Sequence, residues 1–281
     1  MRRMVIALSA AVSGLIASAV VAASPTAAPE AALAAPSPVV VIFMENKERS
    51  SIENSADADY LKSFEANGTS FTHYYAITHP SLPNYLAFAS GSTKGKVGSD
   101  SISAGEISGA NVFSQAQGAG VSWGVYEESM PSACYKGVSS GEYRLRHNPA
   151  MPFANIASKP KKCNKVVPYT SFNVNSLPSL SFVTPNMCND MHDCSIATGD
   201  NWLQANVPPM LNAGATVVIT FDEGSSGTNG GGNVYAAVDG PGIASSTDTA
   251  TYSHYSLLAA LEARLGLTKL GGAKTASVLP I

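Results

Sequence analysis

The chain has 281 residues, of which 45% are hydrophobic and 13% are charged, and its formal net charge is -3. This length and composition suit one large α/β domain, or two small ones, with an apolar core and a lightly charged surface. The nearly balanced charge excludes the basic surface with which proteins commonly bind nucleic acid, so we expect no nucleic-acid partner.

The N-terminal residues have the pattern of an export signal. Arg2 and Arg3 supply positive charge, and an apolar, alanine-rich segment follows that ends in small residues. We predict a signal peptide over residues 1–23, with cleavage after Ala23 or as late as residue 35, and a flexible Ala/Pro leader over residues 24–35. The mature protein is then secreted and has no stable membrane span. A retained anchor stays open, because the apolar segment is borderline in length for a membrane span.

Residues 36–281 are expected to form a single domain in which strands alternate with helices. In chain order, apolar and helical patterns predict a strand at 38–43, helices at 60–68, 85–91 and 111–120, strands at 121–126 and 180–184, a helix at 202–214, strands at 215–221 and 233–238, and a helix at 254–267. The glycine-rich segment 224–233 is expected to be a flexible connection, with a functional lid as the alternative. This alternation predicts an α/β fold: a mostly parallel central sheet with helices on both faces.

The four cysteines are even in number, which indicates two disulfides in an exported chain. Pairing Cys188 with Cys194 closes a short loop, and pairing Cys134 with Cys163 closes a longer one. We favour this arrangement, and the other two pairings stay open. A metal site made of cysteines is weakly indicated, because no CxxC pair occurs.

Polar side chains follow several of the predicted strands at their carboxyl ends. In open α/β sheets these ends meet at one edge, where ligands bind. Carboxylates gathered there repel one another, and a divalent cation removes the conflict. Each acid taken alone is often only a loop residue or a helix N-cap. Together they predict a metal site at this edge, from the residues Glu45, Asn46, Glu127, Glu128, Asp190, His192, Asp193, Asp222 and Glu223.

The stretch HPSLPNYLAFASG places Ser81 at the start of a predicted helix. Ser81 can simply cap that helix. Alternatively, its hydroxyl lies in the positive potential of the helix N-terminus, where a neighbouring metal lowers its pKa and makes it a nucleophile. His79 can bind phosphate or pack beneath the loop, and His147 has no companion that the sequence identifies.

Five motifs, in order over nearly all of the predicted mature chain, resemble the phosphoesterase family of bacterial acid phosphatases and phosphatidylcholine-type phospholipases C. That family belongs to the alkaline phosphatase-like superfamily. The motifs are MEN (44–46), HPSLPNY (79–85), PNMCNDMHD (185–193), ITFDEG (219–224) and HYSLL (254–258).

The resemblance implies an alkaline phosphatase-like fold and one or two divalent cations of unknown identity. The metal count stays open, because two-metal relatives carry Asp-His where this chain has Asp222-Glu223. The implied metal ligands are Glu45, Asn46, Ser81, Asp222, Glu223 and Asp190. The implied catalytic residues are Ser81, His192 and His254, and the phosphate-binding candidates are Asn84, His79 and Asp100.

We therefore expect a secreted, metal-dependent acid phosphatase that hydrolyses phosphate monoesters through a phosphoserine at Ser81. Its partner is a small phosphorylated substrate or a phospholipid head group. A phospholipase C or another phosphodiesterase of the superfamily is the alternative. A carboxylic esterase is a further one, because Ser81, Asp222 and His254 have the chain order of an α/β-hydrolase triad, although GxSxG is missing. The last alternative is a non-enzymatic protein that binds a cation.

Overall fold

The structure is a computed structural model that describes residue 1, residues 7–11 and residues 37–281. The chain divides into two units, residues 1–35 and residues 36–281. The predicted signal peptide falls largely outside the described residues, and the predicted Ala/Pro leader lies wholly outside them. Both assignments stay predictions, and everything below concerns the second unit.

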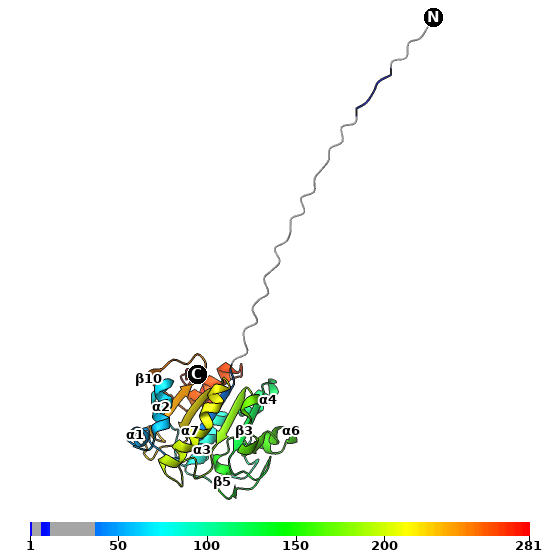
Figure 1. Ribbon diagram of the computed structural model, residues 1–281. Coiled ribbons are helices and arrows are strands. Elements are labelled where there is room, and N and C mark those ends of the chain that lie inside the picture. Colours follow the sequence, from blue (N-terminus) through cyan, green and yellow to red (C-terminus); the bar gives the residue numbers. More distant parts are fainter. Residues whose placement is uncertain (2–6, 12–36) are drawn as a thin grey trace. The chain divides into compact units, whose positions relative to one another are not determined.

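An eight-stranded sheet forms the centre of this unit (Figure 1). Across the sheet the order is β10-β2-β9-β8-β1-β7-β3-β6. Strand β9 runs antiparallel to both of its neighbours, and the other neighbouring pairs are parallel. This confirms a mostly parallel sheet. The strands are β1 (Val39–Met44), β2 (Thr69–Tyr75), β3 (Trp123–Glu127), β6 (Val166–Pro168), β7 (Leu180–Thr184), β8 (Thr216–Phe221), β9 (Ala236–Asp239) and β10 (Ser246–Ser253).

The central strand β1 lies between β7 and β8 and is buried along its whole length. Its sequence VVVIFM is a continuous apolar run, as expected for a parallel strand that is covered on both faces. In register, Val39 pairs with Leu180 and Thr216, and Met44 pairs with Phe221. The residues that follow these three strands therefore leave the sheet at the same edge.

Helices cover both faces of the sheet, as predicted. On one face α2 (Asp59–Asn67) packs on α7 (Ile196–Asn212). On the other, α3 (Ser81–Ser90) packs on α4 (Val112–Gly118) and α8 (His254–Arg264). The remaining helices and short strands are α1 (Arg49–Glu53), α5 (Ala154–Ala157), α6 (Pro160–Cys163), the hairpin β4 (Ser139–Ser140) and β5 (Tyr143–Arg144), and the 3-10 turns η1 (Leu145–His147), η2 (Tyr169–Ser171), η3 (Val174–Ser176) and η4 (Gly271–Lys274).

Three strands of the central sheet, β2, β6 and β10, and the short hairpin β4–β5 escaped the sequence prediction, and helix α7 begins earlier than predicted. The sequences of β2 (TSFTHYY) and β10 (STDTATYS) are largely polar, and β10 is mostly exposed. Helix α7 starts six residues before the predicted Trp202, because Ser195 caps it by accepting a hydrogen bond from the backbone N–H of Thr198.

The glycine-rich segment 224–233 is a hydrogen-bonded turn packed on Glu48. The N–H of Gly224 donates to the carbonyl of Gly231 at 2.7 Å, and the N–H of Ser226 donates to Glu48 Oε1 at 2.8 Å. A Cβ on Gly224 would lie 2.4 Å from Glu48 Oε1, so a side chain cannot be accommodated there without movement. This turn is more tightly held than the expected flexible connection.

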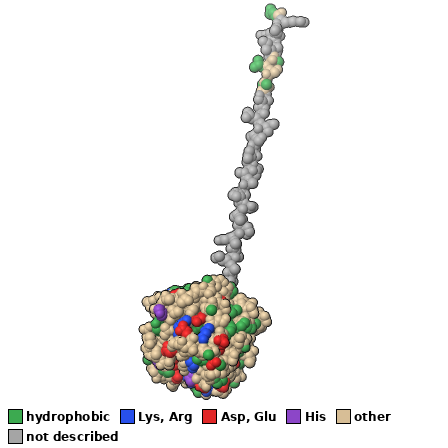
Figure 2. Space-filling model, turned by 60° about the vertical axis from the view of Figure 1, so that its left-hand side comes forward, with side chains coloured by type: hydrophobic (Ala, Val, Ile, Leu, Met, Phe, Trp, Pro, Cys, Tyr) green, Lys and Arg blue, Asp and Glu red, His purple; other side chains and the backbone are tan. Residues whose placement is uncertain are grey.

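Both favoured disulfides, Cys134–Cys163 and Cys188–Cys194, are present. Figure 2 shows acidic and basic side chains interspersed among uncharged ones on the face that it displays. Among the residues that the structure describes, no helix combines the length and apolarity that crossing a membrane requires.

Candidate active site

Three acidic side chains converge where β1, β7 and β8 end. The N–H of Glu45 donates to the carbonyl of Asp190 at 2.9 Å, and the N–H of Asn46 donates to Asp222 Oδ1 at 3.2 Å. Glu45, Asp190 and Asp222 are completely buried. The sheet thus brings together carboxylates that lie far apart in the sequence, and Glu223 joins them through Ser81.

Ser81 is the first residue of α3, and its hydroxyl faces this acid cluster. Ser81 Oγ lies 3.0 Å from Glu45 Oε2 and 3.3 Å from Glu223 Oε1. The side chain that caps the helix is that of Asp100, whose Oδ1 accepts from the N–H of Leu82 at 3.0 Å. Because Asp100 takes the capping role, the serine hydroxyl points at the carboxylates.

The cluster holds buried oxygens without partners. Asp190 Oδ2, Asp222 Oδ2 and Asn46 Oδ1 have no hydrogen-bond partner in the described part of the chain. Asn46 also adopts the left-handed backbone conformation, with φ of 52°, which asparagine tolerates better than most residues. An unpaired buried carboxylate oxygen is costly, so these atoms are suited to contact a positively charged partner.

The titration behaviour points the same way. Burial, together with the charges of Asp222 and Asp190, raises the pKa of Glu45 well above its usual range. Burial raises the pKa of Asp190 to about 8, and burial with the charge of Glu223 raises the pKa of Asp222 to about 7. The protein alone therefore disfavours full ionisation, and a bound cation would reverse this. The donor set of carboxylates and an amide oxygen suits a divalent metal.

His147 is a residue of this site that sequence reasoning missed. It lies on η1, is buried, and places Nε2 3.4 Å from Glu45 Oε2 and Nδ1 3.8 Å from Asp190 Oδ2. One atom from each of these three side chains lies within 4.8 Å of the others. Burial lowers the pKa of His147 well below its usual range, so the ring is neutral, which is the form that binds metal. No local motif marks His147, because only the fold brings it to the acids.

Asn84 and Asp100, two of the implied phosphate-binding residues, shape the start of α3. Asn84 Oδ1 accepts from the N–H groups of Ile77 and Thr78, and Asn84 Nδ2 donates to the carbonyls of Thr78 and Pro80. Asp100 caps the helix, as described above. Both residues therefore hold Ser81 in place.

His79 lies beside Glu223. Its Nδ1 is 2.5 Å from Glu223 Oε2, and its Nε2 is 2.9 Å from the carbonyl of Ser226. Burial opposes the positive charge on the ring, but the hydrogen bonds with Ser226 and Glu223 outweigh it and raise the pKa of His79. His79 thus orients Glu223 and ties it to the glycine-rich turn.

The two implied catalytic histidines differ in access. His254 is fully buried, with Nε2 2.6 Å from the carbonyl of Asp222 and Nδ1 3.1 Å from the hydroxyl of Tyr74. Burial lowers the pKa of His254 to about 4, so the neutral ring positions the backbone of Asp222. His192 is partly exposed, and its Nδ1 lies 2.7 Å from Asp193 Oδ1.

The loop that carries Asp190 and His192 is closed by the Cys188–Cys194 disulfide. Within it, the N–H of His192 donates to Asp190 Oδ1 at 2.7 Å. The carboxylate is thereby oriented by its own loop, with Oδ2 left toward His147.

Comparisons with a family model and with individual proteins both relate this chain to phosphoesterases. The model of the Phosphoesterase family matches residues 41–268. A phosphatidylinositol-3-phosphatase of Mycobacterium tuberculosis is 34% identical over 95% of this chain and 91% of its own length. A phosphate-repressible acid phosphatase of Penicillium chrysogenum is 33% identical over 83% of this chain, which spans 60% of that relative.

Solved structures show the same fold at low identity. A protein in the alkaline phosphatase superfamily from Vibrio parahaemolyticus superposes with a TM-score of 0.58 at 8% identity, covering 87% of this chain and 70% of its own. A phosphonate monoester hydrolase of Agrobacterium radiobacter gives 0.53 at 12% identity, covering 83% and 74%. The expected alkaline phosphatase-like fold is confirmed.

Proposed function

Since the chain belongs to the Phosphoesterase family and is a phosphoric ester hydrolase, we propose that it is an exported, metal-dependent phosphomonoesterase with Ser81 as its nucleophile. One observation supports this above the others. The hydroxyl at the N-terminus of α3 lies within hydrogen-bond distance of two carboxylates from a buried cluster that holds unpaired oxygens.

Two groups of side chains are suited to hold a divalent cation, and they share Glu45. A bound cation supplies the positive charge that lowers the pKa of the serine hydroxyl and offsets charge developing on the transferred phosphate. The first group is Glu45, Asn46, Ser81, Asp222 and Glu223, and the second is Glu45, His147 and Asp190.

The chain's own residues divide the remaining work. Glu45 accepts hydrogen bonds from Tyr85 and Ser81, which fixes the carboxylate against the nucleophile. Ser81 gives its proton to one of the two carboxylates that its hydroxyl contacts, Glu45 or Glu223, and Ser81 Oγ attacks phosphorus. The bond from phosphorus to the leaving oxygen breaks, that oxygen takes a proton, and water then hydrolyses the phosphoserine. We assign the donation of this proton to a protonated His192, whose ring centroid lies 6.0 Å from that of His147. Asp193 orients His192 Nδ1, and His192 Nε2 has no hydrogen-bond partner in the described part of the chain.

The geometry argues against the carboxylic esterase alternative. In a Ser-His-Asp triad the histidine receives the serine proton and is oriented by a carboxylate. Here both nitrogens of His254 are engaged, one by the hydroxyl of Tyr74 and the other by the backbone of Asp222. The relatives named above are phosphatases, which favours a monoester over the diester of a phospholipase C.

The first test compares three chromogenic esters before and after chelation. We expect hydrolysis of p-nitrophenyl phosphate, little hydrolysis of bis(p-nitrophenyl) phosphate and none of p-nitrophenyl acetate. Chelation should abolish the activity, and one divalent metal added back should restore it. Preference for the diester would establish the phosphodiesterase alternative. Binding of a cation without hydrolysis of any ester would point to a non-enzymatic protein.

The nucleophile is tested by Ser81→Ala, which removes the attacking oxygen and leaves the buried carboxylates in place. We expect kcat to fall by about a thousandfold or more. Phosphate incorporation, measured by mass spectrometry of acid-quenched enzyme, should disappear with it. Ser171→Ala, at an exposed serine of η2, is the matched control. Full activity of the Ser81 variant would refute this assignment.

A further inference from the structure

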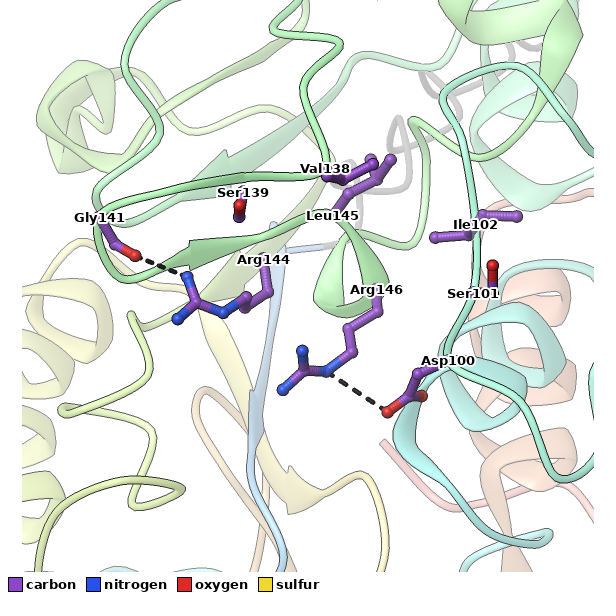
Figure 3. A pocket seen from close by; sticks show the side chains of 9 residues that line it. All are labelled: Asp100, Ser101, Ile102, Val138, Ser139, Gly141, Arg144, Leu145 and Arg146. Carbon is purple, nitrogen blue, oxygen red and sulfur yellow. Dashed lines mark hydrogen bonds and ion pairs between the residues drawn. The ribbon is translucent and has the colours of Figure 1, made fainter.

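A cavity of about 520 Å³ lies between the segment 100–102 and the residues 138–146 (Figure 3). One wall is the segment that begins at Asp100, and the facing wall is formed by the hairpin β4–β5 and by η1. Asp100 is the residue that caps α3 next to Ser81. The cavity therefore opens beside the helix terminus that carries the nucleophile.

The charged side chains that line this cavity in the described chain are Arg144, Arg146 and Asp100. The lining is thus positive by one charge. A net positive lining beside a phosphate-transfer site suits an anionic part of the substrate. Nothing in the proposed chemistry at Ser81 uses these two arginines.

Arg146 connects the cavity to the acid cluster. Its Nε lies 3.5 Å from Asp100 Oδ2 and donates to His147 Nε2 at 3.1 Å. His147 in turn faces Glu45, the carboxylate that contacts Ser81. Arg146 Nε thus contacts both a residue that lines the cavity and a residue of the candidate site.

Arg144 is the more available of the two arginines. Its Nη1 donates to the carbonyls of Gly141 and Tyr143 at 2.6 and 2.9 Å, which holds the guanidinium against the hairpin (Figure 3). Within the described residues no carboxylate pairs with it, and its Nε and Nη2 have no acceptor. A guanidinium with a free edge is well matched to a phosphate, which it can bind through two parallel hydrogen bonds.

We propose that this cavity binds a second anionic group of the substrate, a phosphate or a phosphodiester, through Arg144 and Arg146 while the scissile monoester lies at Ser81. The inference rests on the proposed phosphomonoesterase function and narrows it. The preferred substrates carry two phosphoryl groups, in the form of a soluble bisphosphate or a phosphorylated lipid head group.

The test compares kcat/KM for inositol 3-phosphate and inositol 1,3-bisphosphate, which differ only in the second phosphate. We expect the native enzyme to prefer the bisphosphate by about tenfold or more, the size of effect that charge-assisted hydrogen bonds produce. Arg144→Gln and Arg146→Gln should each lower this ratio, toward the value of about two that the number of cleavable phosphates alone gives. Arg144→Lys should retain an intermediate ratio.

Lys161→Gln, which removes a positive charge from exposed α6, should leave the ratio unchanged. A ratio near two in the native enzyme, or equal losses on both substrates in the arginine variants, would overturn the inference. Hydrolysis of inositol 3-phosphate alone would still uphold the phosphomonoesterase function, so the two failures are distinguishable. Short-chain phosphatidylinositol 3-phosphate in vesicles is the third arm. A higher kcat/KM than for inositol 1,3-bisphosphate would identify the lipid head group as the source, and a lower one would identify the soluble ester. Circular dichroism of each variant verifies folding.

Discussion

At the scale of single residues, Glu45 is the centre of the site. Its two carboxylate oxygens contact the hydroxyls of Ser81 and Tyr85, and one of them also faces His147. It is buried at the end of β1, which neighbouring strands fix on both sides. A carboxylate held this rigidly can position a nucleophile and a cation at once.

His147 offers a test of the second group of metal ligands. His147→Gln keeps a polar side chain but removes the two imidazole nitrogens, of which Nε2 faces Glu45 and Nδ1 faces Asp190. We expect the affinity for the activating metal to fall by about tenfold or more. Chelator competition followed by fluorescence measures this. His73→Gln, at an exposed histidine bonded to the carbonyl of Thr249, is the control. Unchanged affinity would limit His147 to packing against the Tyr85 ring.

At the scale of elements, the two disulfides have different expected roles. Cys188 and Cys194 are separated by 6 positions in the sequence, and their disulfide closes the loop that bears Asp190 and His192. Cys134–Cys163 has a separation of 29 residues, so it restricts the unfolded chain more strongly. Loss of the Cys134–Cys163 disulfide should therefore have the larger effect on stability, and loss of the Cys188–Cys194 disulfide should have the larger effect on metal binding.

These effects can be measured with two double variants. Cys188→Ser with Cys194→Ser should lower the free energy of unfolding by about 2 kcal/mol, and Cys134→Ser with Cys163→Ser by about 3.5 kcal/mol. Metal affinity should weaken mainly in the first pair. Equal loss of metal affinity in both would mean that the short disulfide has no specific part in orienting Asp190.

Helix α8 contains a buried acid whose titration lies far from the site. Glu262 is completely buried and accepts hydrogen bonds from the N–H of Leu270 at 3.0 and 3.2 Å. Burial raises the pKa of Glu262 to about 7. The folded state thus holds this proton more tightly than the unfolded state. The contribution of Glu262 to the free energy of unfolding is therefore fully present below the pKa of the unfolded state, about 4.3, and is lost as the pH rises through 7.

Glu262→Gln removes this pH dependence and keeps an acceptor for Leu270. The variant's Tm should exceed that of the native protein by an amount that grows from pH 5 to pH 8. Differential scanning fluorimetry across that range measures the difference. Glu142→Gln, at an exposed glutamate, should show no such growth. A difference that stays constant with pH would contradict the expectation.

At the scale of the whole molecule, the predicted domain boundary at residue 36 has a structural marker. Ser37 Oγ lies 3.1 Å from Thr216 Oγ1, and Arg264 Nη2 donates to Ser37 Oγ and to its carbonyl at 2.6 and 3.1 Å. These contacts anchor the start of β1 to β8 and α8.

A variant that begins at Pro36 should therefore retain the Tm and kcat of the full chain. A variant that begins at Val39 should lose about 1–3 kcal/mol of unfolding free energy, because Arg264 and Thr216 lose their partner. Urea denaturation of both variants measures the change. A large loss already in the first variant would place the domain boundary earlier.

The sequence predicts those strands that can be identified from their own residues alone, without knowledge of the strands that they pair with. The runs VVVIFM and TVVITF are largely apolar and form β1 and β8, which are buried along their length, and the acids after them meet as expected. Strand β10 could not be predicted, because its polar residues are held in the sheet by pairing with β2, more than 170 residues away.

The sequence likewise predicts only part of the candidate site. Motif order assigned Glu45, Ser81 and Asp222 to one candidate site, and the structure places them together, because each lies at a strand end or a helix start. It could not tell that Asn84 and His254 turn toward backbone groups, since neighbouring residues in a motif differ in side-chain direction. His147 required the fold itself, because η1 meets the acids only through tertiary packing.

The two outermost strands have a consequence for solubility. An open sheet edge can pair with another chain and start aggregation. At one edge β10 is interrupted by a register shift between Asp248 and Thr251, and it carries charge at Asp248. At the other edge β6 has three residues and ends in Pro168, which has no N–H to donate. Both edges are therefore poor templates for intermolecular strand pairing, so we expect the protein to resist aggregation through its sheet edges.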